Sequence, residues 1–208
     1  MRLFAALILV LASLLSGCVH TPPKDLSKFE SDKPSSILVV PPVNESVEVT
    51  APEYLLSTIT IPLAEKGYYV FPVNLVKRVL EDDGLSDSGM VHSADPLKIC
   101  NLFGADSVLY ITIKEWHAQY LVLSTTVNVG LNYTIKSCKT GETLWDHYQK
   151  MVYTPQNSGG GIIGMLVTAA MANAVPNYVP LANQANTQAF YGKGVAIPSG
   201  PYAVAEVK

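Results

Sequence analysis

Two observations predict an α/β (α+β) fold: one compact domain in which short helices pack on a mixed sheet, with an antiparallel meander in its second half. Between residues 36 and 103, short apolar runs alternate with segments of helical pattern. Between residues 107 and 153, the hydrophobic pattern changes to a period of two, which is typical of half-buried strands. The sequence contains no internal repeat.

The first half opens with an apolar run, Ser36–Val40, which two prolines end, and we expect a buried strand there. Thr50 and Glu53 have the spacing of a capping box and predict the start of a helix. Pro62 predicts a kink or a break within that helix. The apolar residues that the helix would turn inward are Leu55, Leu56, Ile59 and Leu63.

Shorter elements follow in the first half. We expect a second strand at Tyr68–Phe71 and short helices at Asn74–Glu81 and Asp95–Phe103. The last helix has proline after Asp95, at the first helical position, and Gly104 just past its end.

The second half predicts three strands, at Ser107–Glu115, Thr125–Lys136 and Thr143–Tyr153. A turn that contains Gly141 separates the last two, so these strands would run antiparallel. In the middle strand, polar residues or glycine occupy the even positions, and apolar residues occupy the odd ones. The odd positions, which we expect to face the core, are Val127, Val129, Leu131, Tyr133 and Ile135.

The N-terminus predicts export and lipidation. One positive charge, an apolar stretch of about a dozen residues and a small-residue exit are typical of a secretory signal peptide, which we assign to residues 1–17. Leu15, Ser16, Gly17 and Cys18 resemble the bacterial lipobox, which implies cleavage before Cys18 and lipid on its thiol and amino group. An ordinary signal peptide with a chance cysteine is the alternative.

The residue after the modified cysteine indicates the destination. In lipoproteins of this kind, an aspartate there usually marks retention in the inner membrane. Val19 stands there, and therefore favours the outer membrane, with the domain facing the periplasm or exposed at the surface. Residues 18–35 are polar and proline-bearing and read as a lipidated flexible tether. Residues 36–208 would form the single domain, with an uncharged, helical C-terminal region at about 159–191.

Charge and cysteine content exclude some classes. Removal of residues 1–17 takes away one basic residue, Arg2, and leaves 13 basic against 17 acidic residues, a formal charge of −4. This balance argues against nucleic acid as a partner. Cys100 and Cys138 would lie in an oxidising compartment, but two cysteines carry little pattern. A disulfide between them stays open, and we favour buried or free thiols.

The stretch around Gly159, Gly161 and Gly164 satisfies a dinucleotide-binding spacing on paper. No acidic residue follows at the distance that a ribose contact needs, and the preceding strand is antiparallel by our reading, so nucleotide binding is not predicted. A helix over 162–174 would be about 20 Å long, too short to span a bilayer.

A spacing of four between small residues lets another backbone approach this helix closely. Packing on the sheet is the favoured interpretation, followed by self-association or a partner helix and then by a lipid surface. The residues of this possible interface are Gly160, Gly164, Thr168 and Ala172. The next segment, 180–191, is weakly amphipathic, and we expect its polar face to carry Asn183, Gln184, Asn186 and Gln188.

Catalytic and metal-binding constellations are weak. His92 with Asp95 could suggest acid–base chemistry, but helix capping and a solvated loop explain both. Glu115 and His117 share a strand face that His147 could approach, yet the sequence has none of the usual metal-ligand spacings. We therefore predict no catalytic residue, no metal and no cofactor.

Three stretches, Pro62–Val73, Phe103–Ile113 and Ile197–Tyr202, resemble a family of Gram-negative lipoproteins of unassigned function that includes a neisserial surface-antigen candidate. The resemblance implies an α/β domain related to the amino-terminal domain of TolB. It also implies neighbourhood with a lipoprotein similar to the curli secretion pore, CsgG. The family supplies no catalytic residues.

These features favour a non-catalytic outer-membrane lipoprotein, anchored through Cys18, that serves as a subunit or adaptor of an envelope or secretion complex. Its partner would be a pore-like lipoprotein, a second copy of the chain, or both. The alternatives are a periplasmic regulator of peptidoglycan synthesis and a small-ligand-binding transport component.

Overall fold

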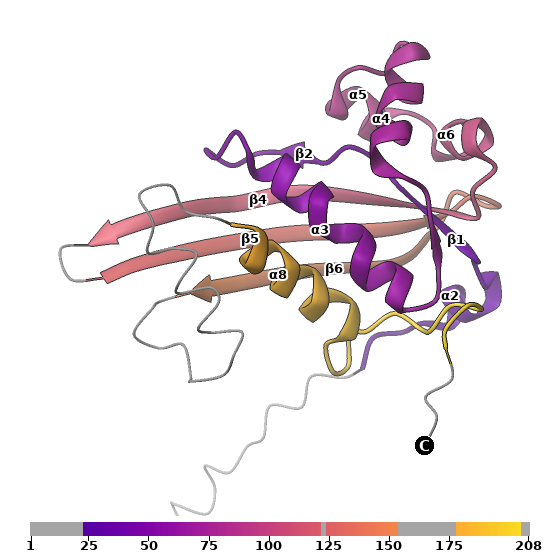
Figure 1. Ribbon diagram of the computed structural model, residues 1–208. Coiled ribbons are helices and arrows are strands. Elements are labelled where there is room, and N and C mark those ends of the chain that lie inside the picture. Colours follow the sequence, from indigo (N-terminus) through magenta and orange to yellow (C-terminus); the bar gives the residue numbers. More distant parts are fainter. Residues whose placement is uncertain (1–22, 122–123, 154–177, 205–208) are drawn as a thin grey trace, which may run out of the picture.

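The computed structural model describes residues 23–121, 124–153 and 178–204. They form one open, mixed sheet of six strands in the order β3-β1-β4-β5-β6, with β2 beside β4 (Figure 1). The strands are β1 (Ser36–Val39), β2 (Val43–Asn44), β3 (Tyr69–Val70), β4 (Ser107–Leu121), β5 (Ser124–Ser137) and β6 (Thr143–Tyr153). The helices are α2 (Ser27–Asp32), α3 (Ala51–Glu65), α4 (Val73–Asp82), α5 (Ser88–Ser93), α6 (Pro96–Phe103) and α8 (Val179–Tyr191). The predicted fold class is confirmed.

The sheet has two parts of different topology. β1 pairs in parallel with β3 and β4, and β2 also pairs in parallel with β4. The long strands β4, β5 and β6 pair antiparallel, as the period of two predicted. The parallel pairs are short and need crossover helices, whereas the meander needs only turns. The helical half of the chain therefore supplies the parallel part of the sheet.

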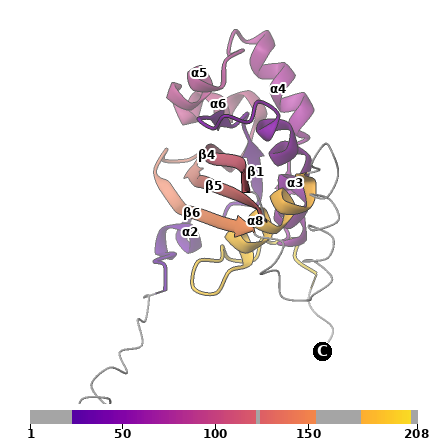
Figure 2. The same ribbon diagram turned by 90° about the vertical axis from the view of Figure 1, so that its left-hand side faces the viewer.

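Helices α3 and α8 cover one face of the sheet and enclose the larger hydrophobic core (Figures 1 and 2). The inward residues predicted for the middle strand all lie in this core. Asn186 was expected on the polar face of its helix, and this prediction is wrong. Its side chain is fully buried, accepts a hydrogen bond from the Tyr133 hydroxyl at 2.7 Å and donates to the Thr58 hydroxyl at 3.0 Å.

Helices α4, α5 and α6 cover the opposite face, but only where β1 meets the start of β4. Side chains alternate between the two faces along each strand, so the neighbours of the residues in the larger core point to this side. Leu38 and Val108, for example, are buried against these helices. The smaller core also contains Leu80 and Ile99. Further along that face the described side chains are mostly polar, such as Glu115 and Lys150, although Val152 also lies there. The described part of the molecule therefore has three layers at one end and two at the other.

Helix ends follow the sequence in part. In α6, the Asp95 carboxylate accepts the Leu97 N–H at 3.0 Å, and Gly104 ends the helix with φ of +66°, as predicted. The capping box at Thr50 is wrong, because Thr50 has helical dihedral angles and its hydroxyl donates to Glu48 instead. Helix α3 also continues through Pro62 to Glu65, so Pro62 does not break it. Helix α5 was not anticipated.

Candidate functional site

Residues 23–35, which we call the strap, pack against the domain ahead of β1. The strap contains α2, whose Phe29 is only 2% exposed and packs edge-on against Tyr68 with ring centroids 6.2 Å apart. Leu26, three residues earlier, packs partly buried against the same core. The expectation of a flexible tether is therefore wrong for 23–35, and the packed domain begins before residue 36. One apolar side on a polar segment was enough to dock it.

The start of the strap is bound to the first part of β6 and to the loop after α8. The Lys24 backbone N–H donates to the Gly194 carbonyl at 3.0 Å, and the Lys24 ammonium lies 3.1 Å from the Asp146 carboxylate. The Lys28 ammonium lies 3.5 Å from Glu142. The pairs are partly or largely exposed, so each adds little stability on its own. Together, the two ion pairs fix the position at which the chain enters the domain.

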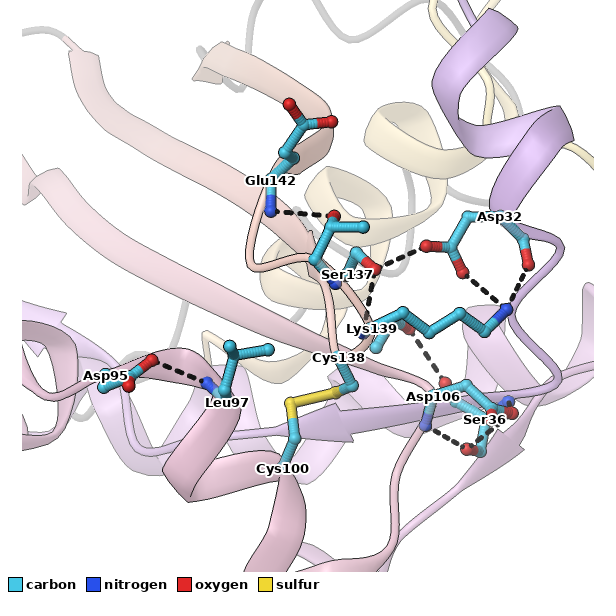
Figure 3. The surroundings of a disulfide bond; sticks show 12 residues. Asp32, Ser36, Asp95, Leu97, Cys100, Asp106, Ser137, Cys138, Lys139 and Glu142 are labelled. Atoms are coloured by element: carbon cyan, nitrogen blue, oxygen red, sulfur yellow. Dashed lines mark hydrogen bonds and ion pairs between the residues drawn. A yellow bond between two sulfur atoms is a disulfide. The ribbon is translucent and has the colours of Figure 1, made fainter.

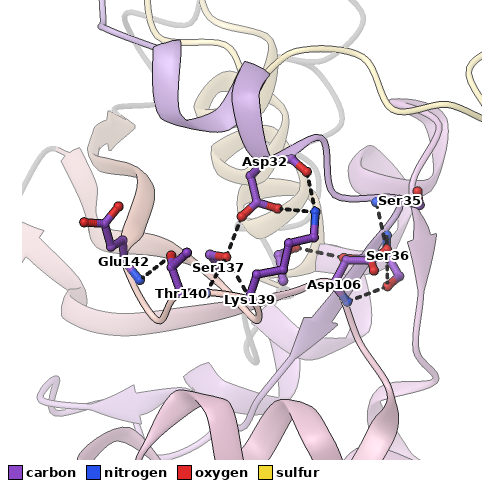
Figure 4. Close-up of polar contacts among 9 residues, drawn as sticks. Asp32, Ser35, Ser36, Asp106, Ser137, Lys139, Thr140 and Glu142 are labelled. Atoms are coloured by element: carbon purple, nitrogen blue, oxygen red, sulfur yellow. Dashed lines mark hydrogen bonds and ion pairs between the residues drawn. The ribbon is translucent and has the colours of Figure 1, made fainter.

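The end of the strap is bound more tightly (Figure 4). The Asp32 carboxylate, 7% exposed, accepts hydrogen bonds from the Ser137 hydroxyl and, at 3.1 Å, from the Lys139 ammonium. Lys33 then adopts left-handed backbone with φ of +52°, which ends α2 and turns the chain towards β1. The strap is thus held at both ends by different parts of the meander.

Asp106, at the start of β4, joins the strap to the sheet (Figure 4). Its carboxylate accepts the backbone N–H groups of Ser35 and Ser36 at 2.9 and 3.0 Å. The Ser36 hydroxyl donates to the same carboxylate and accepts the Asp106 N–H at 2.9 Å. One carboxylate therefore accepts the hydrogen bonds of the donors at the start of β1. This role explains an acidic residue in this partly buried position.

The C-terminal segment lies beside the strap. The Tyr68 hydroxyl donates to the Pro198 carbonyl at 2.7 Å, and the Gly200 N–H donates to the Lys66 carbonyl at 2.8 Å. Gly67 has φ of +87°, and a Cβ there would lie 2.1 Å from the Ala203 nitrogen. Only glycine fits at this crossing, because both the backbone conformation and the close approach exclude a side chain.

An open pocket of about 490 Å³ lies between the strap and the C-terminal segment. Its apolar walls come from Phe29, Tyr68 and three prolines, and its polar groups include Glu30 and Lys33. Burial raises the pKa of Tyr68, so its hydroxyl stays protonated and remains a donor to Pro198. The mostly apolar walls of this pocket suit packing or binding.

The sequence profile of the GNA1162-like lipoprotein family matches residues 24–191 of this chain. A lipoprotein of Neisseria meningitidis serogroup B, NMB1124/NMB1162, is 37% identical over 175 residues, which are 82% of this chain and 81% of the relative. This chain belongs to the GNA1162-like lipoprotein family.

The solved structure of one family member agrees with this assignment. The crystal structure of lipoprotein GNA1162 from N. meningitidis superposes with a TM-score of 0.58 at 37% identity, covering 65% of this chain and 94% of that one. A PelC dodecamer from Paraburkholderia phytofirmans gives a TM-score of 0.47 at 14% identity, covering 83% and 95%. The GNA1162-like relatives carry the name lipoprotein, and none of these matches indicates a catalytic family.

The three stretches that resembled the GNA1162-like family meet at the strap. Pro62–Val73 and Ile197–Tyr202 bind each other through the Tyr68 and Gly200 contacts. Phe103–Ile113 supplies Asp106, which holds the end of the strap. Sequence reasoning noticed these stretches but assigned them no role. The hints that it missed were a single phenylalanine in a polar segment and a glycine directly before an aromatic pair.

A disulfide joins Cys100 of α6 to Cys138 in the turn after β5, with Cα atoms 5.6 Å apart (Figure 3). The expectation of separate thiols is therefore wrong. The pairing follows from strand register, because Ser107 lies opposite Ser137 at the ends of β4 and β5. This register places Cys138 beside Asp106, and the packing of α6 on the sheet brings Cys100 to the same place.

His92 and Asp95 do not form an acid–base pair. The His92 ring packs edge-on against Tyr110 at 5.1 Å, and its Nε2 lies 3.1 Å from the Pro41 carbonyl oxygen. Burial lowers the pKa of His92, so it is neutral at pH 7. Asp95 caps α6 through Leu97. Both residues have structural partners.

The possible metal trio does not converge. Glu115 lies on the open face of the sheet, where the Lys150 ammonium lies 3.1 Å away and the Tyr148 hydroxyl 3.3 Å away. His117 lies on the same face, but His147 is opposite Tyr133 in the register and therefore faces the other way. In the described ranges, no cluster of three or more histidine, cysteine or acidic side chains could hold a metal ion.

The remaining predicted site residues lie outside the described residues. They are the lipobox residues Leu15, Ser16, Gly17 and Cys18, and the possible interface residues Gly160, Gly164, Thr168 and Ala172. Within 23–121, 124–153 and 178–204, no helix combines the length and hydropathy needed to cross a membrane.

Proposed function

We propose that this GNA1162-like protein is a non-catalytic outer-membrane lipoprotein, anchored through Cys18, that acts as a subunit or adaptor of an envelope complex. Lipid on Cys18 would hold the domain at the membrane. The uncharged region from about 159 to 191 would supply the contact with a partner lipoprotein or with a second copy. The mechanism is an anchor combined with an interface, and no bond is made or broken.

Family membership supports the anchor, since GNA1162-like relatives carry the name lipoprotein and the sequence carries Leu15, Ser16, Gly17 and Cys18 in lipobox order. Each acyl chain contributes about 0.8 kcal/mol per buried CH₂, so two or three chains anchor stably.

One structural observation carries the proposal: the strap enters at one end of the sheet, and the chain leaves β6, ahead of the uncharged region, at the other end. The strap is bound near its start through Lys24, beside Asp146 of β6. The uncharged segment leaves β6 after Tyr153, seven residues further on, which is about 24 Å along a strand. It re-enters at Tyr178, whose ring packs against Trp116 near that same end. A domain held by the first end can offer the second to a partner.

In-cell cross-linking, followed by purification of the lipid-anchored protein and mass spectrometry, tests the interface. We expect Thr168→Lys to abolish recovery of the partner while the protein still folds. Ser86→Lys, which introduces the same charge at an exposed position outside the uncharged region, is the control and should leave recovery unchanged. A folded Thr168→Lys variant that associates normally removes this surface from the proposal.

The identity of the recovered protein decides between functions. A pore-like lipoprotein would establish the envelope-complex role. A peptidoglycan synthase, together with a change in glycan polymerisation in a reconstituted assay, would instead support the regulator. Recovery of the chain alone would favour a homo-oligomer or a ligand carrier.

Cys18→Ala tests the anchor separately. The variant should lose its acyl chains by intact mass and move from the membrane fraction to the soluble fraction. Membrane retention without acyl chains would contradict the proposal.

A further inference from the structure

We infer that the strap holds the domain against the bilayer, so that the face around Lys24, Lys28 and Lys193 rests on phospholipid head groups. This inference rests on the proposed anchor at Cys18 and deepens it, because it assigns a membrane-facing surface and a maximum distance.

Chain length gives the distance. From Cys18 to Lys24, the first residue bound to the domain, six peptide links reach at most about 21 Å. If the strap were undocked as far as Ser36, eighteen links would reach about 63 Å. Docking therefore shortens the possible separation about threefold. The domain cannot stand far from the lipid while the strap is bound.

The strap is bound as part of the fold and not as a loose linker. Phe29 lies in the larger core, the Lys24 N–H is paired with Gly194, and Asp32 is paired with Ser137 and Lys139. Undocking would expose the Phe29 ring and would separate the nearly buried Asp32 carboxylate from Ser137 and Lys139. These contacts involve both ends of the strap, so partial release of one end leaves the other bound.

Charge distribution indicates which side faces the lipid. Exposed lysines gather where the strap enters: Lys28 lies on α2, and Lys193 precedes Gly194, which binds Lys24. The helices α4 and α5 lie on the far side of the molecule (Figure 1). Their exposed carboxylates are Glu81, Asp82, Asp83 and Asp87. The strap side is close to neutral, because Asp146 and Glu142 pair Lys24 and Lys28. The far side carries its four carboxylates against Lys77 and Arg78, so lipid phosphates repel the far side more strongly.

Aromatic exposure agrees with this orientation. Tyr202 is 65% exposed in the C-terminal segment, which shares a pocket with the strap. Tyrosine suits the head-group layer because its ring is apolar and its hydroxyl is polar. The strap side therefore offers both basic and interfacial aromatic groups.

The test is photo-cross-linking of the purified, lipidated full chain in vesicles of phosphatidylethanolamine and phosphatidylglycerol. p-Benzoylphenylalanine is placed at Lys193 or Tyr202, and at Leu75 of α4 as the far-side control, which is 62% exposed. We expect phospholipid adducts at the first two positions at least five-fold above the third. Equal yields at all three would overturn the inference.

Two further variants separate strap docking from folding. An insertion of about twelve Gly/Ser residues between His20 and Thr21 lengthens the chain between Cys18 and Lys24 without changing a described contact. It should lower the adduct yield several-fold. Asp32→Ala should accelerate amide exchange at Lys33, at the end of the strap that the Asp32 contacts hold. Asp25→Ala is its matched control, since the Asp25 carboxylate accepts the Ser27 backbone N–H within the strap itself. If both variants match the unmodified protein in yield and exchange, the strap does not set the distance.

Intact mass measured before the experiment distinguishes the two proposals. A protein without acyl chains on Cys18 would refute the anchor, and the inference with it. A lipidated protein with equal adduct yields would refute only the orientation.

Discussion

The two faces of the sheet are stabilised in different ways. The face under α3 and α8 has the larger core, in which Asn186 links the Tyr133 and Thr58 hydroxyls, while the Trp116 indole N–H has no hydrogen-bond partner among the described residues. The face under α4–α6 has the smaller core, a covalent link at Cys100–Cys138, and a buried Tyr110 hydroxyl with no hydrogen-bond partner among the described residues.

This difference follows from apolar area. Burial of apolar surface stabilises roughly in proportion to its area, so three short helices over part of the sheet contribute less than two long ones along it. A covalent link raises the stability of the smaller core without more area, because it restricts the unfolded chain. We therefore expect packing changes to dominate on the first face and redox changes on the second.

Phe190→Ala should have the largest effect. Its ring is fully buried on α8 and packs with ring centroids 5.4 Å from Tyr133 and 5.6 Å from Trp145. A cavity there should lower the free energy of unfolding by about 3–5 kcal/mol. Urea denaturation monitored by circular dichroism measures this. A loss below about 1 kcal/mol would show that the core closes over the cavity.

Removal of the disulfide by Cys100→Ala with Cys138→Ala should have the next largest effect. The two residues are 38 apart in sequence, and closure of such a loop corresponds to about 4 kcal/mol in the chain-entropy model, as an upper limit. Amide exchange should rise first in α4–α6 and leave β5 protected. Equal acceleration in β5 would mean that the two faces unfold as one unit.

The sequence predicted those parts whose signal is local. The alternation of β5, the caps of α6 and the antiparallel meander were read correctly, because each depends on residues close together in the chain. The disulfide was not, because only the register between β4 and β5 brings Cys138 to α6.

Local sequence patterns also fail to predict buried polar residues and docked terminal segments, for a similar reason. Asn186 counted as polar and was assigned to the surface, but two hydroxyls across the core satisfy its amide. The strap looked like a tether because its composition is polar, yet Phe29 and the Asp32 contacts decide its position. The candidate site therefore emerged from long-range pairing, and no local motif marked it.

Two tyrosine substitutions compare the two faces of the sheet through smaller losses of stability. Tyr133→Phe should cost about 1–2 kcal/mol, because it leaves the buried Asn186 oxygen without a donor. Tyr110→Phe should cost less than about 0.5 kcal/mol or stabilise slightly, since its hydroxyl has no partner in the described part of the chain. Thermal denaturation of both variants checks this, and equal losses would contradict it.

The smallest effect that we expect is a pH dependence confined to the smaller core. Burial lowers the pKa of His92 below 6.5, its ordinary value, so the unfolded chain binds a proton more readily than the folded one. The contribution of neutral His92 is complete above pH 6.5 and is lost as the pH falls towards the lower pKa of the folded state. His92→Gln keeps a donor for the Pro41 carbonyl but cannot gain charge, so it should flatten the fall in stability between about pH 7 and 5.5. Denaturation midpoints of both proteins across that window measure the difference. Parallel curves would mean that His92 is solvated enough to titrate alike in both states, and that the α4–α6 face opens more readily than its packing indicates.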